Sequence, residues 1–269
     1  RVYITDYLGP PYDVEERIFR GSVKLRGLLA KNENDVIAKA RDAEYLMVWH
    51  MVEISSKCID ALKNLKGIVR VGVGYESIDF KYARKRGILV SNVPDYGVDE
   101  VADHSIALIL AIVRKIPYLN AKVKSGRWAW RDAQPIIRLK GKTLGVIGMG
   151  RIGSATALRA KSLGLKVIEY DPYMPPGFEK SLGVEAVEFE QLLKKADIIT
   201  LHTLLSEETR KMIGERELSL MKPSAYLINT SRGGVIDLDA LTKSIKEGKI
   251  AGAALDVIET EPYPDLKHD

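Results

Sequence analysis

The chain has 269 residues, of which 46% are hydrophobic and 29% are charged, a composition typical of an ordinary globular protein of about two domains. No apolar run approaches the roughly 18 residues of a membrane span, and no signal-peptide pattern opens the chain. The net charge of +5 comes from basic residues interspersed with acids, so neither nucleic acid nor a membrane is an expected partner, and the single cysteine, Cys58, excludes an internal disulfide and fits a cytoplasmic protein.

Short apolar runs alternate with helical patterns in the first third of the chain. Strands are predicted at residues 2–5, 45–48, 68–71 and 88–90, while residues 22–28 are ambiguous. Helices are predicted from Asn34 or Asp35 to Ala40, from Ser55 to Leu65 and from Ser77 to Arg86. This alternation predicts a first α/β domain, residues 1–92, with a parallel sheet covered on both faces.

A long helix is predicted next, at residues 101–115, after a Pro- and Gly-bearing crossing at 93–97. It is apolar on nearly every side, so we expect it to be deeply buried as a central helix between two domains. Pro117 ends it, and a second helix reaches Ser125.

The connection at residues 126–142 is long and carries Trp128 and Trp130. Loops of that length in a compact protein are usually functional or pack on another chain. A subunit interface and packing within the chain are the two interpretations left open.

Residues 143–171 carry the most informative pattern. A short apolar run at 143–147 leads into Gly148, Gly150 and Gly153, and a helix at 152–163 and a strand at 166–170 follow, with Asp171 at the strand end. A strand, G-x-G-x-x-G, a helix and an acid 18 residues beyond the last glycine are the context of a dinucleotide fingerprint, although a plain tight turn also uses glycines. Asp171 favours NAD over NADP because its charge repels a 2′-phosphate, unless it is only a turn residue before Pro172.

The α/β alternation continues to the end of the chain. Further strands are predicted at 198–201, 226–229 and 251–255, and further helices at 189–195, 216–221 and 239–247. The strands end in His202-Thr203, in Arg232 shortly after Asn229, and in Asp256. We expect these side chains at the carboxyl edge of one sheet, beside the glycine turn.

Four motifs resemble the D-isomer-specific 2-hydroxyacid dehydrogenases: RVGVGYESID at 70–79, GKTLGVIGMGRIG at 141–153, NTSRGGVID at 229–237 and GAALDVIETEP at 252–262. The resemblance covers nearly the whole chain from about residue 45. Within the family, residues 158–161, residues 170–173 and Trp49-His50 look most like the branch of the C-terminal-binding proteins, with phosphoglycerate dehydrogenases next.

The resemblance implies an α/β fold with two Rossmann-like, doubly wound parallel-sheet domains joined by a long central helix, with the active site in the cleft between them. Residues 1–92 would be the flavodoxin-like substrate domain and residues 93–269 the NAD-binding domain. The implied activity is hydride transfer between NAD(H) and a small, D-specific 2-hydroxy or 2-keto acid; a non-enzymatic NAD(H)-sensing protein is the alternative. A homodimer through the NAD-binding domain is also implied, and no metal.

The resemblance also implies roles for individual residues. Arg232 would bind the substrate carboxylate and polarise its carbonyl, and Glu261 would partner a catalytic histidine. That histidine is expected beyond Asp269, since His268 lacks the family context, and the chain is therefore expected to be truncated and inactive as it stands. The implied cofactor-binding residues are Gly148, Gly150, Arg151, Ile152, Gly153, Asp171, His202, Thr203, Thr209, Thr230, Ser231 and Asp256. The implied substrate-binding residues are Arg70, Val73, Gly74, Trp49 and His50.

Overall fold

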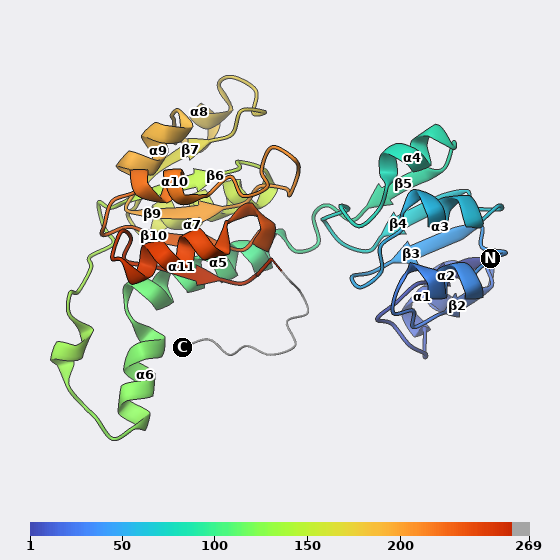
Figure 1. Cartoon of the computed structure of the whole chain (residues 1–269), viewed down its shortest axis with the longest axis horizontal. Helices are drawn as coiled ribbons and strands as arrows, with labels where there is room; N and C mark the ends of the chain where they lie inside the picture. The colour runs from blue at the N-terminus through green and yellow to red at the C-terminus, as the bar shows by residue number, and fades with distance from the viewer. Residues whose placement is uncertain (260–269) are drawn as a thin grey trace. The chain divides into compact units, whose positions relative to one another are not determined.

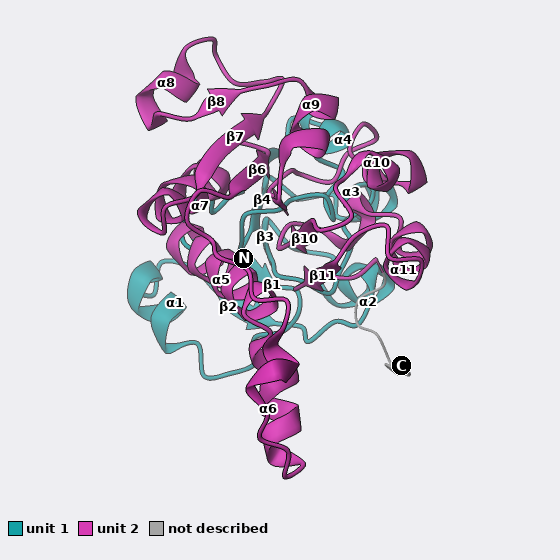
Figure 2. Cartoon of the chain, turned by 90° about the vertical axis from the view of Figure 1, so that its left-hand side faces the viewer, with its two compact units in different colours: residues 1–97 teal, residues 98–269 magenta. Residues whose placement is uncertain are grey.

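The computed structural model of the chain describes residues 1–259, which fall into two compact units, coloured separately in Figure 2: unit 1 is residues 1–97 and unit 2 begins at residue 98. Each unit has a parallel sheet of its own, with five strands in unit 1 and six in unit 2. The predicted α/β class with two parallel sheets is confirmed.

Unit 1 has the strand order β2-β1-β3-β4-β5, which is the order of flavodoxin-like sheets. Its strands are β1 (Val2–Ile4), β2 (Leu25–Gly27), β3 (Tyr45–Val48), β4 (Gly67–Arg70) and β5 (Leu89–Asn92). Its helices are α1 (Asp13–Phe19), α2 (Glu33–Lys39), α3 (Ser56–Ala61) and α4 (Phe80–Lys85). The order reverses between β1 and β3, and ligands of such sheets bind beyond the strand ends at this point.

Two helices of unit 1 begin at residues other than those predicted. The side chain of Asn32 caps α2 by accepting a hydrogen bond from the Asp35 amide at 3.2 Å. Helix α4 begins after Asp79, not at Ser77, because Ile78 is buried and forms a β-bridge with Ile54. This tertiary contact keeps the residues before Asp79 out of the helix.

Unit 2 has the strand order β11-β10-β9-β6-β7-β8, which is the order of a Rossmann sheet. Its strands are β6 (Thr143–Ile147), β7 (Lys166–Tyr170), β8 (Glu185–Ala186), β9 (Ile198–Leu201), β10 (Tyr226–Asn229) and β11 (Gly252–Leu255). Its α-helices are α5 (Val98–Val113), α6 (Ile116–Lys124), α7 (Arg151–Ser162), α8 (Phe178–Leu182), α9 (Phe189–Lys195), α10 (Glu215–Leu220) and α11 (Leu238–Lys246). Short 3-10 helices lie at η1 (Trp130–Ala133) and η2 (Gly233–Val235).

Helices cover both faces of the unit 2 sheet, as Figure 1 shows. On one face, Ile109 of α5 and Ala157 of α7 pack with strand residues such as Val146. On the other face, Leu193 of α9 and Leu241 of α11 pack with a second set of strand residues. The strands are buried on both sides, which explains why their sequences are continuous apolar runs.

Helix α5 is less buried than its sequence predicts. Among the described residues only one stripe of it, Ala102, Ser105, Ile109 and Val113, is buried. Leu108 and Ile112 on another face line an apolar pocket of ~510 Å³, together with Tyr118 from the start of α6. The prediction of deep burial on every side is therefore wrong, because the sheet and α7 cover only part of the helix. Pro117 lies in the first turn of α6, where it needs no N–H partner.

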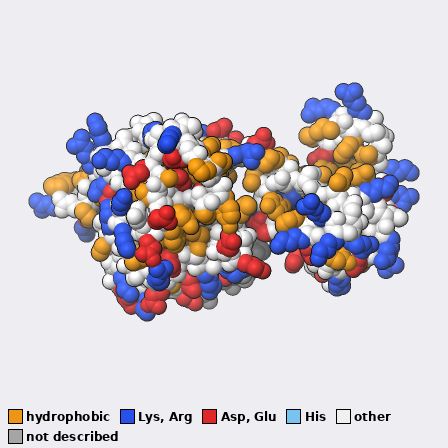
Figure 3. All heavy atoms as spheres, turned by 90° about the horizontal axis from the view of Figure 1, so that it is seen from above, with side chains coloured by type: hydrophobic (Ala, Val, Ile, Leu, Met, Phe, Trp, Pro, Cys, Tyr) orange, Lys and Arg blue, Asp and Glu red, His pale blue; other side chains and the backbone are white. Residues whose placement is uncertain are grey.

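The surface carries both signs of charge. Figure 3 shows Lys and Arg interspersed with Asp and Glu on the face drawn, and not gathered into a single basic surface. Within residues 1–259, no helix combines the length and the apolar character that crossing a bilayer requires. In the same part of the chain, no three His, Cys, Asp or Glu side chains are grouped as metal ligands would be.

Candidate active site

The glycine turn after β6 is shaped by close backbone contacts. Gly148 has a φ of +91°, and a Cβ there would lie 2.8 Å from the carbonyl carbon of His202, at the end of the neighbouring strand β9. A Cβ on Gly153 would lie 2.0 Å from the carbonyl oxygen of Gly148. The first glycine thus permits the turn against β9, and the third lets α7 pack against its own turn.

Gly150 differs from the other two glycines because it is exposed and a Cβ on it would meet no heavy atom within 4 Å. It is the N-cap of α7, and its position brings no side-chain cap to the helix. The first backbone N–H groups of α7, including those of Arg151 and Ile152, therefore have no partner within the helix. The helix dipole adds a partial positive charge at the same place, beside Gly150. This helix start can take an anionic group whose approach any side chain at 150 would obstruct.

Asp171 stands directly after β7 and reaches the glycine turn. One carboxylate oxygen accepts a hydrogen bond from the Met149 amide at 2.8 Å, and the other accepts one from the Tyr173 amide at 3.0 Å. The contact with Tyr173 is that of a turn residue, which was the alternative role for Asp171. The contact with Met149 links Asp171 to the glycine turn of the dinucleotide fingerprint. Both oxygens keep lone pairs that can accept from ribose hydroxyls.

His202 and Thr203 follow β9, next to the glycine turn. Burial lowers the pKa of His202 to about 4, so its ring is neutral near pH 7 and does not supply a proton as an imidazolium. Its Nε2 lies 3.0 Å from the Thr200 hydroxyl. The buried hydroxyl of Thr203 has no hydrogen-bond partner among the described residues, which marks a polar position that a ligand can satisfy.

The turn after β10 is organised by Asn229, which the sequence analysis did not single out. Asn229 is fully buried, and its Oδ1 accepts hydrogen bonds from the amide and the hydroxyl of Ser231. Its Nδ2 donates to the Arg232 carbonyl at 2.9 Å, and Arg232 Nη1 donates to the Ser231 carbonyl at 2.7 Å. An amide side chain directly after an apolar run was the available signal. Asn229 thus sets the backbone from which Arg232 projects.

The turn after β11 lies beside the turn after β10. The Asp256 amide donates to the Asn229 carbonyl at 3.0 Å, and a Cβ on Gly233 would lie 1.9 Å from the carbonyl carbon of Ile258. Asp256 Oδ1 also lies 3.1 Å from Nε2 of His104, a residue of α5 that the sequence analysis did not identify. Gly233 therefore lets the segment after β11 pass close to the Arg232 turn.

Two predicted residues contribute less directly. The Thr209 hydroxyl accepts from the Ser206 amide at 2.8 Å and donates to the Leu204 carbonyl, so it holds its own loop together. Glu261, the predicted partner of the catalytic histidine, lies outside the described residues.

In unit 1, the predicted substrate residues lie at the carboxyl ends of β3 and β4. Asp6, after β1, is 1% exposed and accepts hydrogen bonds from the amides of Trp49 and His50 at 3.2 and 2.9 Å. Trp49 also stacks on Tyr7, with ring centroids 5.5 Å apart. Asp6, which the sequence analysis did not single out, thus shapes the loop after β3 at the point where the strand order reverses.

Arg70 ends β4 and is buried, with Nη2 3.3 Å from Nδ1 of His50. The glycine-bearing segment after it is held by β5, since Asn92 Nδ2 donates to the Val73 carbonyl at 2.7 Å. Unit 1 therefore brings Arg70, His50 and the backbone of Val73 and Gly74 to one edge of its sheet.

The residues of unit 2 fit an adenine dinucleotide. The glycine turn, the uncapped start of α7, Asp171, the unpartnered Thr203 hydroxyl, Arg232 and Asp256 all lie at the carboxyl edge of one Rossmann sheet. An anion-accepting helix start beside an acid suited to a ribose is the arrangement that binds NAD. Fold and site together define a Rossmann-type NAD-dependent oxidoreductase.

Comparison with known proteins gives a consistent result. Residues 106–268 match the model of the D-isomer specific 2-hydroxyacid dehydrogenase, NAD binding domain. A glyoxylate reductase of Thermococcus litoralis is 47% identical over 85% of this chain and 71% of its own length. A D-3-phosphoglycerate dehydrogenase of Methanocaldococcus jannaschii is 44% identical over 91% of this chain, which spans only 46% of that relative.

A solved structure extends the likeness to three dimensions. The D-lactate dehydrogenase of Aquifex aeolicus, complexed with NAD and lactic acid, has a TM-score of 0.89 and 34% identity, covering 97% of this chain and 78% of its own. The chain belongs to the D-isomer-specific 2-hydroxyacid dehydrogenase family. The predicted cofactor NAD and the predicted NAD-dependent 2-hydroxyacid dehydrogenase activity are confirmed at this level.

Proposed function

We propose that the protein reduces a small 2-keto acid, of the size of glyoxylate or pyruvate, to the 2-hydroxy acid with NADH, and to the D isomer where the product is chiral. The observation that carries this proposal is the gathering of a dinucleotide fingerprint, Arg232 and Asp256 at one edge of the unit 2 sheet. The glyoxylate reductase and lactate dehydrogenase relatives support a small substrate.

Arg232 is proposed to bind the substrate carboxylate and to polarise the keto oxygen. A guanidinium forms paired hydrogen bonds with a carboxylate and keeps its charge at every working pH. Its backbone is set by Asn229, and Gly233 after it leaves the space that the backbone of Ile258 occupies. This support limits the positions that the side chain can take, which favours catalysis that depends on orientation.

The cofactor is proposed to lie along the carboxyl edge of unit 2 and, when bound, supplies or accepts the hydride. The start of α7 holds the pyrophosphate of the cofactor, and Asp171 accepts a hydrogen bond from the adenosine ribose. The Thr203 hydroxyl forms a hydrogen bond with the cofactor. Thr230, Ser231 and Asp256 are proposed for the nicotinamide half, with Asp256 accepting from the carboxamide N–H. Support comes from the positions of these residues at the ends of β10 and β11.

Substrate binding is proposed also for the edge of unit 1. Arg70 and the backbone N–H groups of Val73 and Gly74 would bind the substrate carboxylate, and Trp49 and His50 would line its side-chain position. The burial of Arg70 and its contact with His50 support a constrained cationic site.

The proton for the keto oxygen is proposed to come from a histidine paired with Glu261. His202 is not that histidine, because its lowered pKa leaves its ring neutral. The expectation that this chain is inactive as it stands has no support in the comparisons, which concern the family and not the activity of this chain.

The proposal is tested with a form of the protein that carries the proton-donating histidine, by following NADH oxidation with glyoxylate, pyruvate, hydroxypyruvate and phosphohydroxypyruvate. We expect turnover with at least one of the three unphosphorylated acids and less with the phosphorylated one. Tight NADH binding without turnover on any of the acids would contradict the proposal. It would favour the NAD(H)-sensing alternative of the C-terminal-binding-protein type.

We also propose a homodimer formed through unit 2. Trp128 and Trp130 are 86% and 67% exposed in the connection after α6. The same connection contributes Asp132 and Gln134 to the ~510 Å³ pocket between α5, the start of α6 and the β10–β11 edge. Exposed aromatic side chains and a mainly apolar pocket on the same unit are typical of a protein interface, and a second copy of the chain is the proposed partner.

Sedimentation of the Trp128→Asp, Trp130→Asp double variant tests the dimer. We expect a monomer, whereas Tyr173→Asp, which changes an equally exposed aromatic residue elsewhere in unit 2, leaves the dimer intact. A wild-type monomer, or a dimer that survives the double change, would refute the proposed interface.

A further inference from the structure

Three consecutive side chains of α5 reach three different parts of the NAD-binding unit. Asp103 pairs with Arg159 of α7, His104 contacts Asp256 after β11, and Ser105 contacts Thr230 after β10. One turn of α5 therefore connects the dinucleotide helix with both strand ends proposed for the nicotinamide.

The contact between His104 and Asp256 engages only one of the two carboxylate oxygens. His104 Nε2 lies 3.1 Å from Asp256 Oδ1, and the two side chains are 49% and 48% exposed. The Asp256 backbone is already held by the Asn229 carbonyl, so the histidine acts on the side chain alone. Oδ2 remains on the same carboxylate for another donor.

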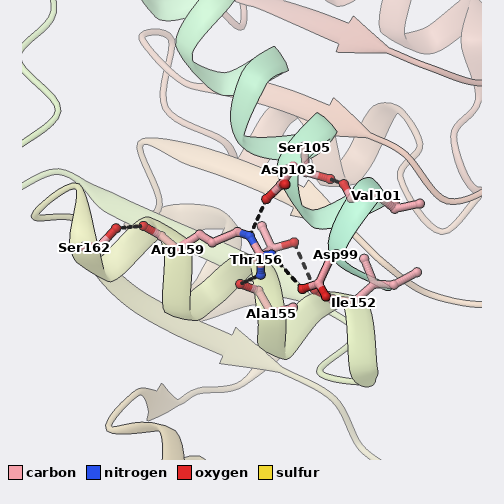
Figure 4. A network of polar contacts seen from close by, with 9 residues as sticks. All are labelled: Asp99, Val101, Asp103, Ser105, Ile152, Ala155, Thr156, Arg159 and Ser162. Carbon is pink, nitrogen blue, oxygen red and sulfur yellow. Dashed lines mark hydrogen bonds and ion pairs between the residues drawn. The ribbon is translucent and has the colours of Figure 1, made fainter. Parts of the chain in front are cut away.

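Helix α5 is held in place on both sides of His104 by hydrogen bonds to α7 and to the end of β10. Figure 4 shows Arg159 of α7 reaching both Asp99 and Asp103 of α5, at 2.7 and 2.5 Å. The buried Ser105 hydroxyl donates to the Val101 carbonyl and shares a hydrogen bond of 2.9 Å with the Thr230 hydroxyl. His104 is thus carried by a turn that is fixed to α7 on one side and to β10 on the other.

We propose that His104 is a positioning residue for the cofactor: it orients the Asp256 carboxylate so that Oδ2 accepts from the nicotinamide carboxamide. The proposal rests on the proposed role of Asp256. An aspartate without this partner would sample several rotamers, and ordering it on binding would cost conformational entropy. Since the pair is half exposed, its effect is modest, about two- to fivefold in affinity.

The test compares two ligands that differ only at the carboxamide. Calorimetry measures the Kd of NADH and of the reduced 3-acetylpyridine analogue, in which a methyl group replaces the NH2 donor. Wild type should prefer NADH, and Asp256→Ala should lose that preference. His104→Leu should lose about two- to fivefold of it, while His104→Gln, whose amide NH2 can occupy the Nε2 position, should retain it.

Asp103→Asn is the matched control, because it weakens the α5–α7 contact on the same turn without touching Asp256. It should leave the preference for NADH unchanged. If His104→Leu keeps the full preference while Asp256→Ala loses it, the positioning role is refuted and the proposed role of Asp256 stands. If wild type shows no preference, the role of Asp256 fails and the positioning role fails with it.

Discussion

Alanine substitutions of Gly150, the N-cap of α7, and of Gly153, in its first turn, are expected to affect the stability of the fold differently. A Cβ on Gly150 would meet no heavy atom within 4 Å, and its φ of −64° lies outside the left-handed region that favours glycine. A Cβ on Gly153 would lie 2.0 Å from the Gly148 carbonyl oxygen, whereas ordinary contact begins at 3.4 Å. Gly150→Ala should therefore fold normally, and Gly153→Ala should force α7 away from its own turn by more than 1 Å.

Both changes should weaken NADH binding, for different reasons. The alanine methyl at 150 would occupy the space that the pyrophosphate needs, and overpacking of this kind costs about 1–3 kcal/mol, or about 5- to 150-fold in Kd. At 153 a similar cost falls on the folded protein, so the Tm should drop by about 2–12 °C, since about 1 kcal/mol shifts the Tm by about 2–4 °C in domains of this size.

Calorimetry with NADH and thermal unfolding without it, on the same protein samples, test this pair. Gly150→Ala should keep the wild-type Tm within about 2 °C and bind NADH at least about fivefold more weakly. An unchanged Kd for Gly150→Ala would show that the pyrophosphate does not approach this backbone. A Tm loss as large as that of Gly153→Ala would show that the space beside Gly150 is not open.

Three further outcomes are expected. Asp171→Ser should weaken NADH binding about tenfold and reduce the preference for NADH over NADPH, because the ribose acceptor and the charge that repels a 2′-phosphate are both removed. Fluorescence titration with the two cofactors measures both effects, and an unchanged preference for NADH would contradict the role of Asp171. Arg232→Ala should abolish keto-acid turnover while NADH still binds, and turnover within tenfold of wild type would exclude Arg232 from catalysis. His202 has a pKa of about 4 in the folded protein, below its ordinary 6.5, so the unfolded chain binds the proton more readily. The free energy of unfolding should therefore fall by up to about 3 kcal/mol as the pH falls from 6.5 to 4. Urea unfolding at the two pH values should show a smaller loss in His202→Gln than in wild type, and equal losses would refute the assignment.

The sequence predicted the parts of the fold that depend on local pattern. Strands β6, β7, β9 and β10 and helix α9 have the predicted bounds, because a strand buried on both faces leaves an uninterrupted apolar run between turn residues. Helix α1 was not predicted, since it has seven residues, none of them buried, and too few apolar positions to mark a periodic pattern. Helix α4 begins later than its sequence suggests, because Ile78 is drawn into a bridge with Ile54.

Some residues of the candidate site could be predicted from the sequence and others were found only in the structure. The glycine turn, Asp171, Arg232 and Asp256 could be found from sequence, since each follows a predicted strand and parallel strands end at one edge of their sheet. Asp6 and His104 could not, because their importance lies in contacts with residues far along the chain. Asn229 contacts Ser231 and Arg232 within its own turn, so its position after an apolar run was a signal that the sequence offered.

The sequence by itself determined the α/β class, the dinucleotide fingerprint and the strand ends that carry its chemistry. These follow from periodicity and from glycine spacing, which are local properties of the chain. Only the tertiary structure decided which face of α5 is buried and which side chain contacts Asp256. Packing and hydrogen bonds between distant segments settle those questions, and no stretch of sequence records them.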